Sequence, residues 1–561
     1  MRLGHASRRR DHGRARPHLR PRAPEGLEEG QGRLKADVVI IGGGHNGLVA
    51  AALLARGGLK PLVLERREVL GGAAVTEEFH PGFKASTVAH LLGPLRPSVV
   101  EALDLKNRGL GFLEPEPRVF APLRDGGGVA LYGDAGKTAF ELRKTSPADA
   151  DRYPEFHRSL SAVSTYLSRL LSMTPPDIDE PLKGGPIFPL VGLGLGFRAL
   201  GREDAQRLLR WAPMAVADFA SEWFSSEVLR AIVCGRGIHG LFAGPWSAGT
   251  TANLLLGAAA GDGNGAGTAV QLTGGLGSLI GALTAAARQH GAEVRTRAEV
   301  ERITVKDGRV AGVVLAGGEE IEARAVVSSA DPKRTFLGLL DPAVLDPDDL
   351  RRLRNYRQQG MASKVNLALD ALPSFRGDVP TGLLRGRIHI GPDVDDLERA
   401  FDDAKYGAAS RRPYLEVTIP SLSDPTLAAA GKHVMSVYVQ FTPYTLRDGG
   451  GWDMQRDTLA DTVLHTLEEY VPGLSSLVLG RHVLTPIDLE RTYGLTGGHP
   501  SHGEAALDQL FLARPLLGWG RYRGPLPGLY MCGAGTHPGG GVTGGPAANA
   551  AREILKDLRQ R

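Results

Sequence analysis

A glycine-rich loop at residues 42–47 is the feature of this 561-residue chain best suited to binding a phosphate. Gly42 would allow a tight turn, Gly44 a close approach of the backbone to a pyrophosphate, and Gly47 close packing of a helix on a strand. A helix that begins at such a loop points its free N–H groups at the phosphates. Glu65 follows 18 residues after Gly47, where a carboxylate can accept hydrogen bonds from ribose hydroxyls. The spacing predicts a dinucleotide site.

A second run of small residues, at positions 533–545, follows an expected strand at 528–532. Small residues let the backbone approach a flat ring closely. A helix expected from about Gly545 to Leu558 would aim its positive end at negative charge that develops on such a ring. The two ends of the chain are therefore expected to bind one cofactor together.

The elements around the first loop are expected to be a strand, a helix and a second strand. Residues 37–41 are a continuous apolar run, typical of a strand buried on both faces, and residues 48–55 and 61–65 follow as helix and strand. The alternation then lapses, and turn residues indicate an antiparallel meander between residues 294 and 327. An NAD enzyme would continue a six-stranded sheet without interruption. A single fingerprint with a distant meander favours FAD and a split domain.

We predict an α/β fold with a Rossmann-like FAD-binding domain of the glutathione-reductase or amine-oxidase type. An α+β substrate domain built on an antiparallel sheet is expected to be inserted into it. The predicted FAD-binding domain is discontinuous and comprises residues 36–110, 268–335 and 495–561. The predicted substrate domain comprises residues 111–267 and 336–494.

Period-two alternation at 364–369, 414–419 and 434–439 predicts a sheet with one solvated face. Apolar residues at helical spacing predict a helix that ends near Met173, with Pro154 in its first turn. The uncharged run at 184–197 is either a greasy entrance or interfacial patch, or a buried core segment.

Composition excludes several classes of protein. Hydrophobic residues make up 42% and charged residues 23% of the chain, which is typical of globular proteins, and no apolar stretch is long enough to span a membrane. Residues 1–35 hold ten basic and four acidic residues, whereas the remainder holds 56 and 58, so nucleic-acid binding has no electrostatic support. Two distant cysteines exclude a CxxC pair and a cysteine-based metal site. We expect residues 1–35 to be a disordered basic tail, with a targeting peptide as the less favoured interpretation.

No acid–base constellation stands out, so the catalytic residues are left unassigned. His499, His502 and Glu504 share one loop, for which a solvated loop is favoured over a substrate-pocket lining, and both over a metal site; no metal is predicted. His537 is expected to be a structural histidine near the ring. His45 and Asn46 are expected to shape the glycine loop or to face solvent.

The motifs at 37–49, 65–76 and 533–541 resemble those of the FAD-dependent carotenoid desaturase/ketolase (phytoene dehydrogenase-like) superfamily. Segments 484–491 and 506–515 are similar to a branch known as pyridine nucleotide-disulphide oxidoreductase domain-containing proteins. The resemblance spans about residues 36–558. The disulphide part of that name has no counterpart here, and with no second nucleotide domain stable NAD(P)H binding is not expected.

The resemblance implies a set of FAD contacts. Pyrophosphate and ribose contacts would come from both ends of the first crossover, adenine would meet a backbone position on the meander, and the ribityl chain and ring would meet the C-terminal turn. Many relatives, including amine oxidases, have Arg where this chain has Ala73, which weakens an amine-oxidase interpretation. The implied residues are Gly42, Gly44, His45, Asn46, Gly47, Glu65, Arg66, Arg67, Gly71, Gly72, Ala73, Val300, Gly533, Gly535, Gly541, Val542 and Thr543.

The resemblance further implies an FAD-dependent oxidoreductase that moves a hydride between a C–H bond of an apolar substrate and flavin, with oxygen, a quinone or another acceptor taking the electrons. The alternatives are a carotenoid desaturase or ketolase and a low-turnover flavoprotein that acts through protein–protein interaction. The expected partner is a small lipid- or polyene-like molecule, with room for a peripheral membrane contact; the oligomeric state is open. The expected location is the cytoplasm, or the mitochondrial matrix in a eukaryote.

Overall fold

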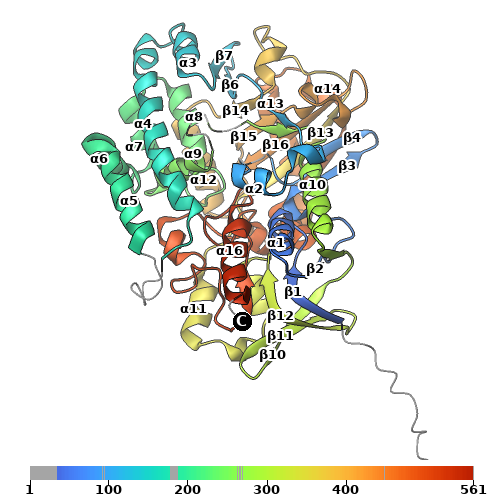
Figure 1. Ribbon diagram of the computed structural model, residues 1–561. Coiled ribbons are helices and arrows are strands. Elements are labelled where there is room, and N and C mark those ends of the chain that lie inside the picture. Colours follow the sequence, from blue (N-terminus) through green and yellow to red (C-terminus); the bar gives the residue numbers. More distant parts are fainter. Residues whose placement is uncertain are drawn as a thin grey trace, which may run out of the picture.

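The computed structural model describes residues 34–559 except 91, 92, 94, 177–186, 262, 264–266, 268 and 448. It has two large sheets, with a layer of helices beside them (Figure 1). Within the described part of the chain, no helix is both long and apolar enough to cross a bilayer. The expected tail lies outside the described residues up to position 33, but β1 already begins at Leu34, three residues before the expected strand.

The first sheet has the order β10-β11-β12-β1-β2-β9, with β18 also paired to β12. Strands β1, β2, β9, β12 and β18 run parallel, whereas β10, β11 and β12 form the antiparallel meander. The fold prediction is confirmed in these strands. Their bounds are β1 Leu34–Ile41, β2 Pro61–Leu64, β9 Glu293–Arg295, β10 Val300–Lys306, β11 Arg309–Leu315, β12 Glu320–Ser328 and β18 Leu529–Met531.

Both faces of the first sheet are covered, which explains the continuous apolar run in β1. Val38 and Ile40 pack with helices α1 (His45–Arg56), α10 (Leu276–Gln289) and α16 (Gly545–Arg559), whereas Val39 and Ile41 pack under the meander. The first and last helices lie side by side in the picture, and an added Cβ on Gly57 would meet Leu555 (Figure 1). The two ends of the chain therefore fold together.

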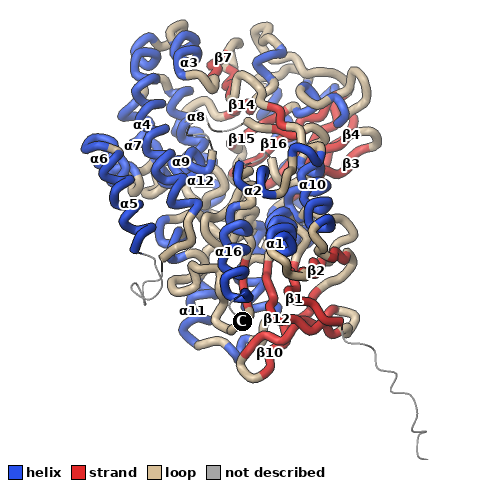
Figure 2. The backbone as a smooth tube through the Cα atoms, viewed as in Figure 1, coloured by secondary structure: helices blue, strands red, loops and turns tan. Residues whose placement is uncertain are grey.

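The second sheet has the order β17-β13-β16-β15-β14-β6-β7 and lies apart from the first (Figure 2). All its neighbouring strands are antiparallel except β14 and β6. Their bounds are β6 Val119–Pro122, β7 Gly128–Leu131, β13 Ala362–Leu369, β14 Arg387–Ile390, β15 Tyr414–Thr418, β16 His433–Gln440 and β17 Val478–Leu484. Two small ribbons complete the strands: β3 Thr76–His80 with β4 Phe83–Ser86, and β5 Phe112–Leu113 with β8 Gln271–Leu272.

The second sheet differs from its prediction because neither face is solvated. One face packs on α13 through Val365, Leu367, Val437 and their neighbours. The opposite, polar face is buried as well, since residues 87–90 and α8 cover it: Asn366 Nδ2 donates to the carbonyl oxygen of Thr87, and Arg236 reaches Glu416. The expected solvated face is therefore an internal polar wall.

The remaining helices form a layer beside the sheets or pack over the sheet faces (Figure 2). Pro154 is not in a first turn but inside α4, which begins at Pro147. The uncharged run, of which residues 184–186 lie outside the described residues, forms α5, and its Val191 and Leu195 are 52% and 63% exposed, so the buried-core interpretation is wrong. The bounds of these remaining helices are α2 Pro97–Ala102, α3 Ala135–Leu142, α4 Pro147–Ser172, α5 Ile187–Ala199, α6 Gly201–Trp211, α7 Val216–Trp223, α8 Glu227–Ile238, α9 Thr250–Ala260, α11 Pro347–Asn355, α12 Val394–Lys405, α13 Gly451–Glu468, α14 Leu474–Leu477 and α15 Pro486–Tyr493.

Candidate functional site

A cleft runs across the carboxyl ends of β1 and β12, where the two parallel strands finish in register. The amide of Ser329, just after β12, donates to the carbonyl oxygen of Ile41 at 2.9 Å. Ile41 is the last residue of β1, and the glycine loop starts directly after it. Nucleotides bind at such strand ends in doubly wound sheets. The predicted site residues that line the cleft are Gly42, Gly44, His45, Asn46, Glu65, Arg66, Gly72, Ala73 and Val300.

The glycines of the loop have separate structural roles. An added Cβ on Gly47 would lie 2.0 Å from the carbonyl oxygen of Gly42, so Gly47 is required for close packing of α1 on the turn. An added Cβ on Gly44 would meet no protein atom closer than 3.8 Å, and the φ of Gly44 is −69°. Only a ligand therefore needs Gly44 to be bare, which supports the predicted approach of a pyrophosphate.

The start of α1 carries polar groups without protein partners. No side chain caps the helix at Gly44, so its first N–H groups are available to an anion. The Asn46 Oδ1 and His45 Nε2 atoms are buried and have no hydrogen-bond partner among the described residues. Asn46 is buried, whereas His45 is half-buried at the cleft, and burial lowers the pKa of His45 to about 4. These orphaned atoms and the open space at Gly44 fit a bound dinucleotide.

Glu65 lies at the end of β2, with its carboxylate fixed by the backbone. Oε2 accepts from the Gly43 amide and Oε1 from the Arg67 amide, each at 2.8 Å. The remaining lone pairs fit ribose hydroxyls. Arg66 lines the cleft and donates to the carbonyl oxygens of Arg491 and Thr492. The Arg67 side chain instead pairs with Glu77 at 2.6 Å and does not line the cleft.

The glycine pair at 71–72 lies directly against the glycine loop. The Gly71 amide donates to the carbonyl oxygen of Gly43 at 2.9 Å, and an added Cβ on Gly72 would meet Gly44 Cα at 3.3 Å. Gly71 itself does not line the cleft. This pair closes one side of the space in front of Gly44.

The C-terminal turn connects the cleft to a larger cavity. Ala534 lines the cleft, whereas Gly541 and Thr543 line the cavity. Gly533 and Gly535 pack against the loop after β12, where added Cβ atoms would lie 2.5 Å from Ser329 O and from Pro332 Cδ. Val542 is buried in the core beneath the first sheet's helices. The turn thus separates two spaces that share one wall.

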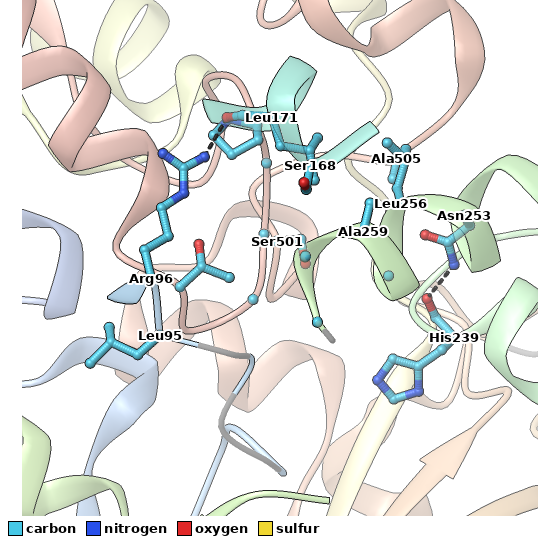
Figure 3. Close-up of a pocket in the computed structure, with 18 of the residues that line it drawn as sticks. Leu95, Arg96, Ser168, Leu171, His239, Asn253, Leu256, Ala259, Ser501 and Ala505 are labelled. Carbon is cyan, nitrogen blue, oxygen red and sulfur yellow. Dashed lines mark hydrogen bonds between the residues drawn. The ribbon is translucent and has the colours of Figure 1, made fainter. Parts of the chain in front are cut away.

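The cavity has a volume of about 830 Å³ and lies between the C-terminal turn and helices α4, α8 and α9. In Figure 3, Arg96 and His239 lie on opposite sides of it, with Ser501 between them. Arg96 bonds the carbonyl oxygen of Leu171, and Asn253 bonds that of His239 at 3.1 Å. Leu171, Leu256 and Val270 supply apolar lining. The cavity can hold a molecule of substantial size beside the turn.

A row of buried polar residues crosses the second sheet behind this cavity. Lys364 pairs in register with Tyr438, Tyr438 with Glu416, and Glu416 with His389. Residues paired in register in an antiparallel sheet share one face, so residues far apart in sequence meet here. Two further residues, Arg387 and Arg236, bind Glu416 Oε2 at 2.7 and 3.2 Å. We call Arg236, Lys364, Arg387, Glu416 and His90 the ionic cluster.

Burial and mutual charge determine the protonation of the ionic cluster. Burial lowers the pKa of Lys364 to about 7, and its Nζ lies 2.6 Å from Nδ1 of His90. Burial lowers the pKa of His90 well below its usual value. Burial would raise the pKa of Glu416, but Arg387 and Arg236 hold it well below its usual range. Glu416 is therefore ionised, and Lys364 can gain or lose a proton near neutral pH.

The loop with His499, His502 and Glu504 is not solvated as expected. His499 is 2% exposed, and its Nδ1 accepts from the Ser501 amide. Glu504 binds Arg357 at 2.9 Å, and His502 lines the cofactor cleft. Within the described ranges no group of His, Cys, Asp or Glu side chains is placed to hold a metal ion.

His537 is buried and turns away from both spaces. Its Nε2 lies 3.0 Å from the carbonyl oxygen of Leu170, its backbone oxygen accepts from Tyr522, and it lines neither the cleft nor the cavity.

Sequence reasoning missed two groups of residues. Ser329 and Ala330, which line the cleft, follow β12, and the end of a strand parallel to β1 was a usable signal. The ionic cluster gave no such signal, because its members come from five separate segments and meet only through strand register and through the packing of α8 and residues 87–90 on the sheet. The ionic cluster contains the charged residues behind the cavity, and no sequence motif indicated them.

Comparison with known proteins agrees with this geometry. The sequence model of the flavin containing amine oxidoreductases matches residues 47–555. The chain is 40% identical over 548 residues to pyridine nucleotide-disulfide oxidoreductase domain-containing protein 2 of Rattus norvegicus, covering 93% of this chain and 94% of the relative. It is 26% identical to a phytoene desaturase (lycopene-forming) of Pseudescherichia vulneris, covering 93% and 99%.

Solved structures show the same fold at low identity. Putrescine oxidase bound to putrescine superposes with a TM-score of 0.59 at 16% identity, covering 94% of this chain and 100% of that one. Ala73, which weakened an amine-oxidase interpretation, does not remove the chain from the wider family. The chain belongs to the flavin-containing amine oxidoreductase family and is an FAD-dependent oxidoreductase.

Proposed function

We propose that this oxidoreductase removes a hydride from a C–H bond of a substrate with a largely apolar body and passes the electrons to oxygen, a quinone or another acceptor. FAD, when bound, supplies the hydride-accepting chemistry. The observation that carries the proposal is the cavity of about 830 Å³ whose wall includes Gly541 and Thr543 of the C-terminal turn. A substrate held there would lie beside the turn that continues into the cofactor cleft.

The residues that would hold FAD are those of the cleft and the turn. Gly44 and the uncapped start of α1 would bind the pyrophosphate, and Glu65 would accept bonds from the ribose. The N-terminus of α16 begins directly after the turn and would stabilise negative charge beside it. Leu171, Leu256 and Val270 would exclude water from the substrate's apolar body.

The ionic cluster supports proton movement at one end of the site. Lys364 Nζ exchanges a proton near neutral pH and contacts His90 Nδ1. Neither residue lines the cavity, so the pair would take up a proton released with the hydride from behind the cavity wall.

We also propose a peripheral contact between α5 and a lipid surface. Val191 and Leu195 are exposed, and Arg198 and Arg202 follow at the end of the apolar run, which suits an anionic bilayer surface. The rings of Phe197 and of Tyr166 on α4 pack with their centroids 6.0 Å apart. Helix α4 also supplies Ser168 and Leu171 to the cavity. A substrate dissolved in lipid would enter beside this helix.

Liposome sedimentation tests the lipid contact. Leu195→Asp should reduce binding to vesicles of phosphatidylcholine with phosphatidylserine, whereas Met454→Asp, at a residue 72% exposed on α13, should not. Equal sedimentation of the two variants would contradict a role for α5.

An anaerobic screen tests the proposed function. Purified holoenzyme is mixed with lipids, polyenes and amines, and loss of flavin absorbance near 450 nm identifies substrates. Bleaching by an apolar or amphiphilic lipid is expected, and bleaching by a polyene alone would favour a carotenoid desaturase or ketolase. A yellow protein that no compound reduces, yet binds a defined partner, would favour the low-turnover flavoprotein. A colourless protein that cannot be reconstituted with FAD would overturn the proposal.

A further inference from the structure

The charges on the cavity wall are unevenly distributed. Of the described residues, four arginines and two glutamates line it, and the glutamates, Glu114 and Glu116, are exposed residues at the rim. The Glu116 side chain is 43% exposed, whereas that of Arg236 is only 20% exposed. A charge inside a low-dielectric wall acts more strongly on a ligand than one in contact with water. The interior of the cavity therefore favours negative charge.

Arg236 is held in place with part of its guanidinium left over. Its Nη1 bonds Glu416 Oε2 at 3.2 Å, and the guanidinium makes no other hydrogen bond to a described residue. Glu416 is 2% exposed and also binds Arg387 at 2.7 Å, so its negative charge is shared. Arginine has five N–H donors in a planar fork that matches an oxyanion. The unused donors of Arg236 are available at the cavity wall.

The neighbours of Arg236 form a rigid polar patch. Asn253 Nδ2 bonds the carbonyl oxygens of Gly237 and His239 at 3.0 and 3.1 Å, which fixes the end of α8. His239 lines the cavity, and its Nδ1 has no partner among the described side chains. Buried polar groups are normally satisfied, so this unpartnered nitrogen of a cavity-lining residue supports a polar ligand.

We propose that this patch binds an oxyanion, a carboxylate or a phosphate monoester, at one end of an amphiphilic substrate. Arg236 binds the anionic group, and the apolar body lies along Leu171, Leu256 and Val270. Arg96, across the cavity in Figure 3, adds a second positive charge. A protonated amine would meet repulsion instead. This inference rests on the proposed function, because it names the substrate class of the same cavity.

Binding of matched twelve-carbon probes to holoenzyme tests the inference. Isothermal titration calorimetry compares dodecanoate, dodecyl phosphate, dodecanol and dodecylamine at pH 7.5, below their critical micelle concentrations. At least one oxyanion should bind about 10- to 100-fold more tightly than dodecanol, since a hydrogen bond to a charged group contributes that much. The tighter of the two oxyanions identifies the head group. Dodecanol or dodecylamine binding as tightly as both oxyanions would overturn the inference.

Variants on helix α8 assign the effect to Arg236. Arg236→Gln should remove most of the oxyanion preference, and Arg236→Lys should keep part of it, while dodecanol affinity changes little. Arg230→Gln is the matched control, because Arg230 lies on the same helix and pairs with Glu227. An unchanged oxyanion preference in a folded Arg236→Gln protein would overturn the role of Arg236. A colourless wild-type protein that cannot be reconstituted with FAD would instead refute the proposed function, and calorimetry on that protein would still report oxyanion binding.

Discussion

The cofactor cleft and the cavity wall share one turn but are built from different parts of the chain. At the cleft, Gly44 leaves room for a ligand, and the Glu65 carboxylate is held by two backbone amides. Both come from one crossover between neighbouring strands. Behind the cavity, Arg236, Lys364 and Glu416 come from α8, β13 and β15, and Glu416 pairs with Arg236 at 3.2 Å.

This difference separates binding from stability. A Cβ added in the cleft occupies space that the ligand needs, so binding is lost. No contact within the protein is broken by the same change. A buried ionic cluster behaves in the opposite way, since removing one partner leaves uncompensated charge inside the protein. Substitutions in the two regions should therefore affect different measurements.

The largest effect on cofactor binding is expected for Gly44→Val. The added atoms would occupy the space of the pyrophosphate, whereas the nearest protein atom to the Cβ lies at 3.8 Å. The variant should purify without flavin, measured by the ratio of absorbance at 450 and 280 nm, and should melt close to the temperature of wild-type apoprotein.

Gly281→Val is the control for this change. Gly281 lies in α10 with no atom within 4 Å of an added Cβ, so the variant should retain FAD. Full flavin occupancy in Gly44→Val would show that the phosphates lie elsewhere. Gly47→Ala should be destabilised, because its Cβ would lie 2.0 Å from a carbonyl oxygen.

Glu416→Gln should have the largest effect on stability. It leaves Arg387, which is 2% exposed, and Arg236 without their shared carboxylate, which typically costs about 3–5 kcal/mol. Urea unfolding of the apoprotein measures this cost. Glu319→Gln removes a half-exposed partner of Arg295 and should cost no more than about 1 kcal/mol. Equal costs for the two variants would contradict the comparison.

A smaller effect is expected for Glu65→Gln. The substitution keeps the shape of the side chain but removes the charge that would accept the ribose hydroxyls, worth about 1.5–3 kcal/mol, and one of the two oxygens that accept from the Gly43 and Arg67 amides. FAD affinity, measured by quenching of flavin fluorescence, should fall about 10- to 100-fold. A weakening of less than twofold would mean that the Glu65 carboxylate does not bind the ribose.

The same comparison explains which features sequence reasoning could reach. The glycine loop, Glu65 and the C-terminal turn were predictable, because backbone shape requires glycine at fixed spacing near strand ends. Lys364 and Glu416 alternate with apolar neighbours as solvated strand residues would. Only the arrival of residues 87–90 and α8 over that face turns them into a buried cluster, and nothing local encodes that arrival.

Lys364→Met tests the buried wall through its pH dependence, with the smallest expected effect. Burial lowers the pKa of Lys364 to about 7, below its value in the unfolded chain. Below pH 7 the lysine is protonated in both states and its contribution is constant. Above pH 7 the unfolded state binds more protons, so wild-type stability gains with rising pH, by at most about 2 kcal/mol up to pH 8.5. The methionine variant lacks this gain, so the free energy of unfolding of the wild type relative to that of the variant should rise between pH 7 and 8.5. Urea unfolding at both pH values measures the gap. A gap that stays constant would mean that water reaches Lys364, and the wall would then resemble the solvated face that its alternating sequence predicts.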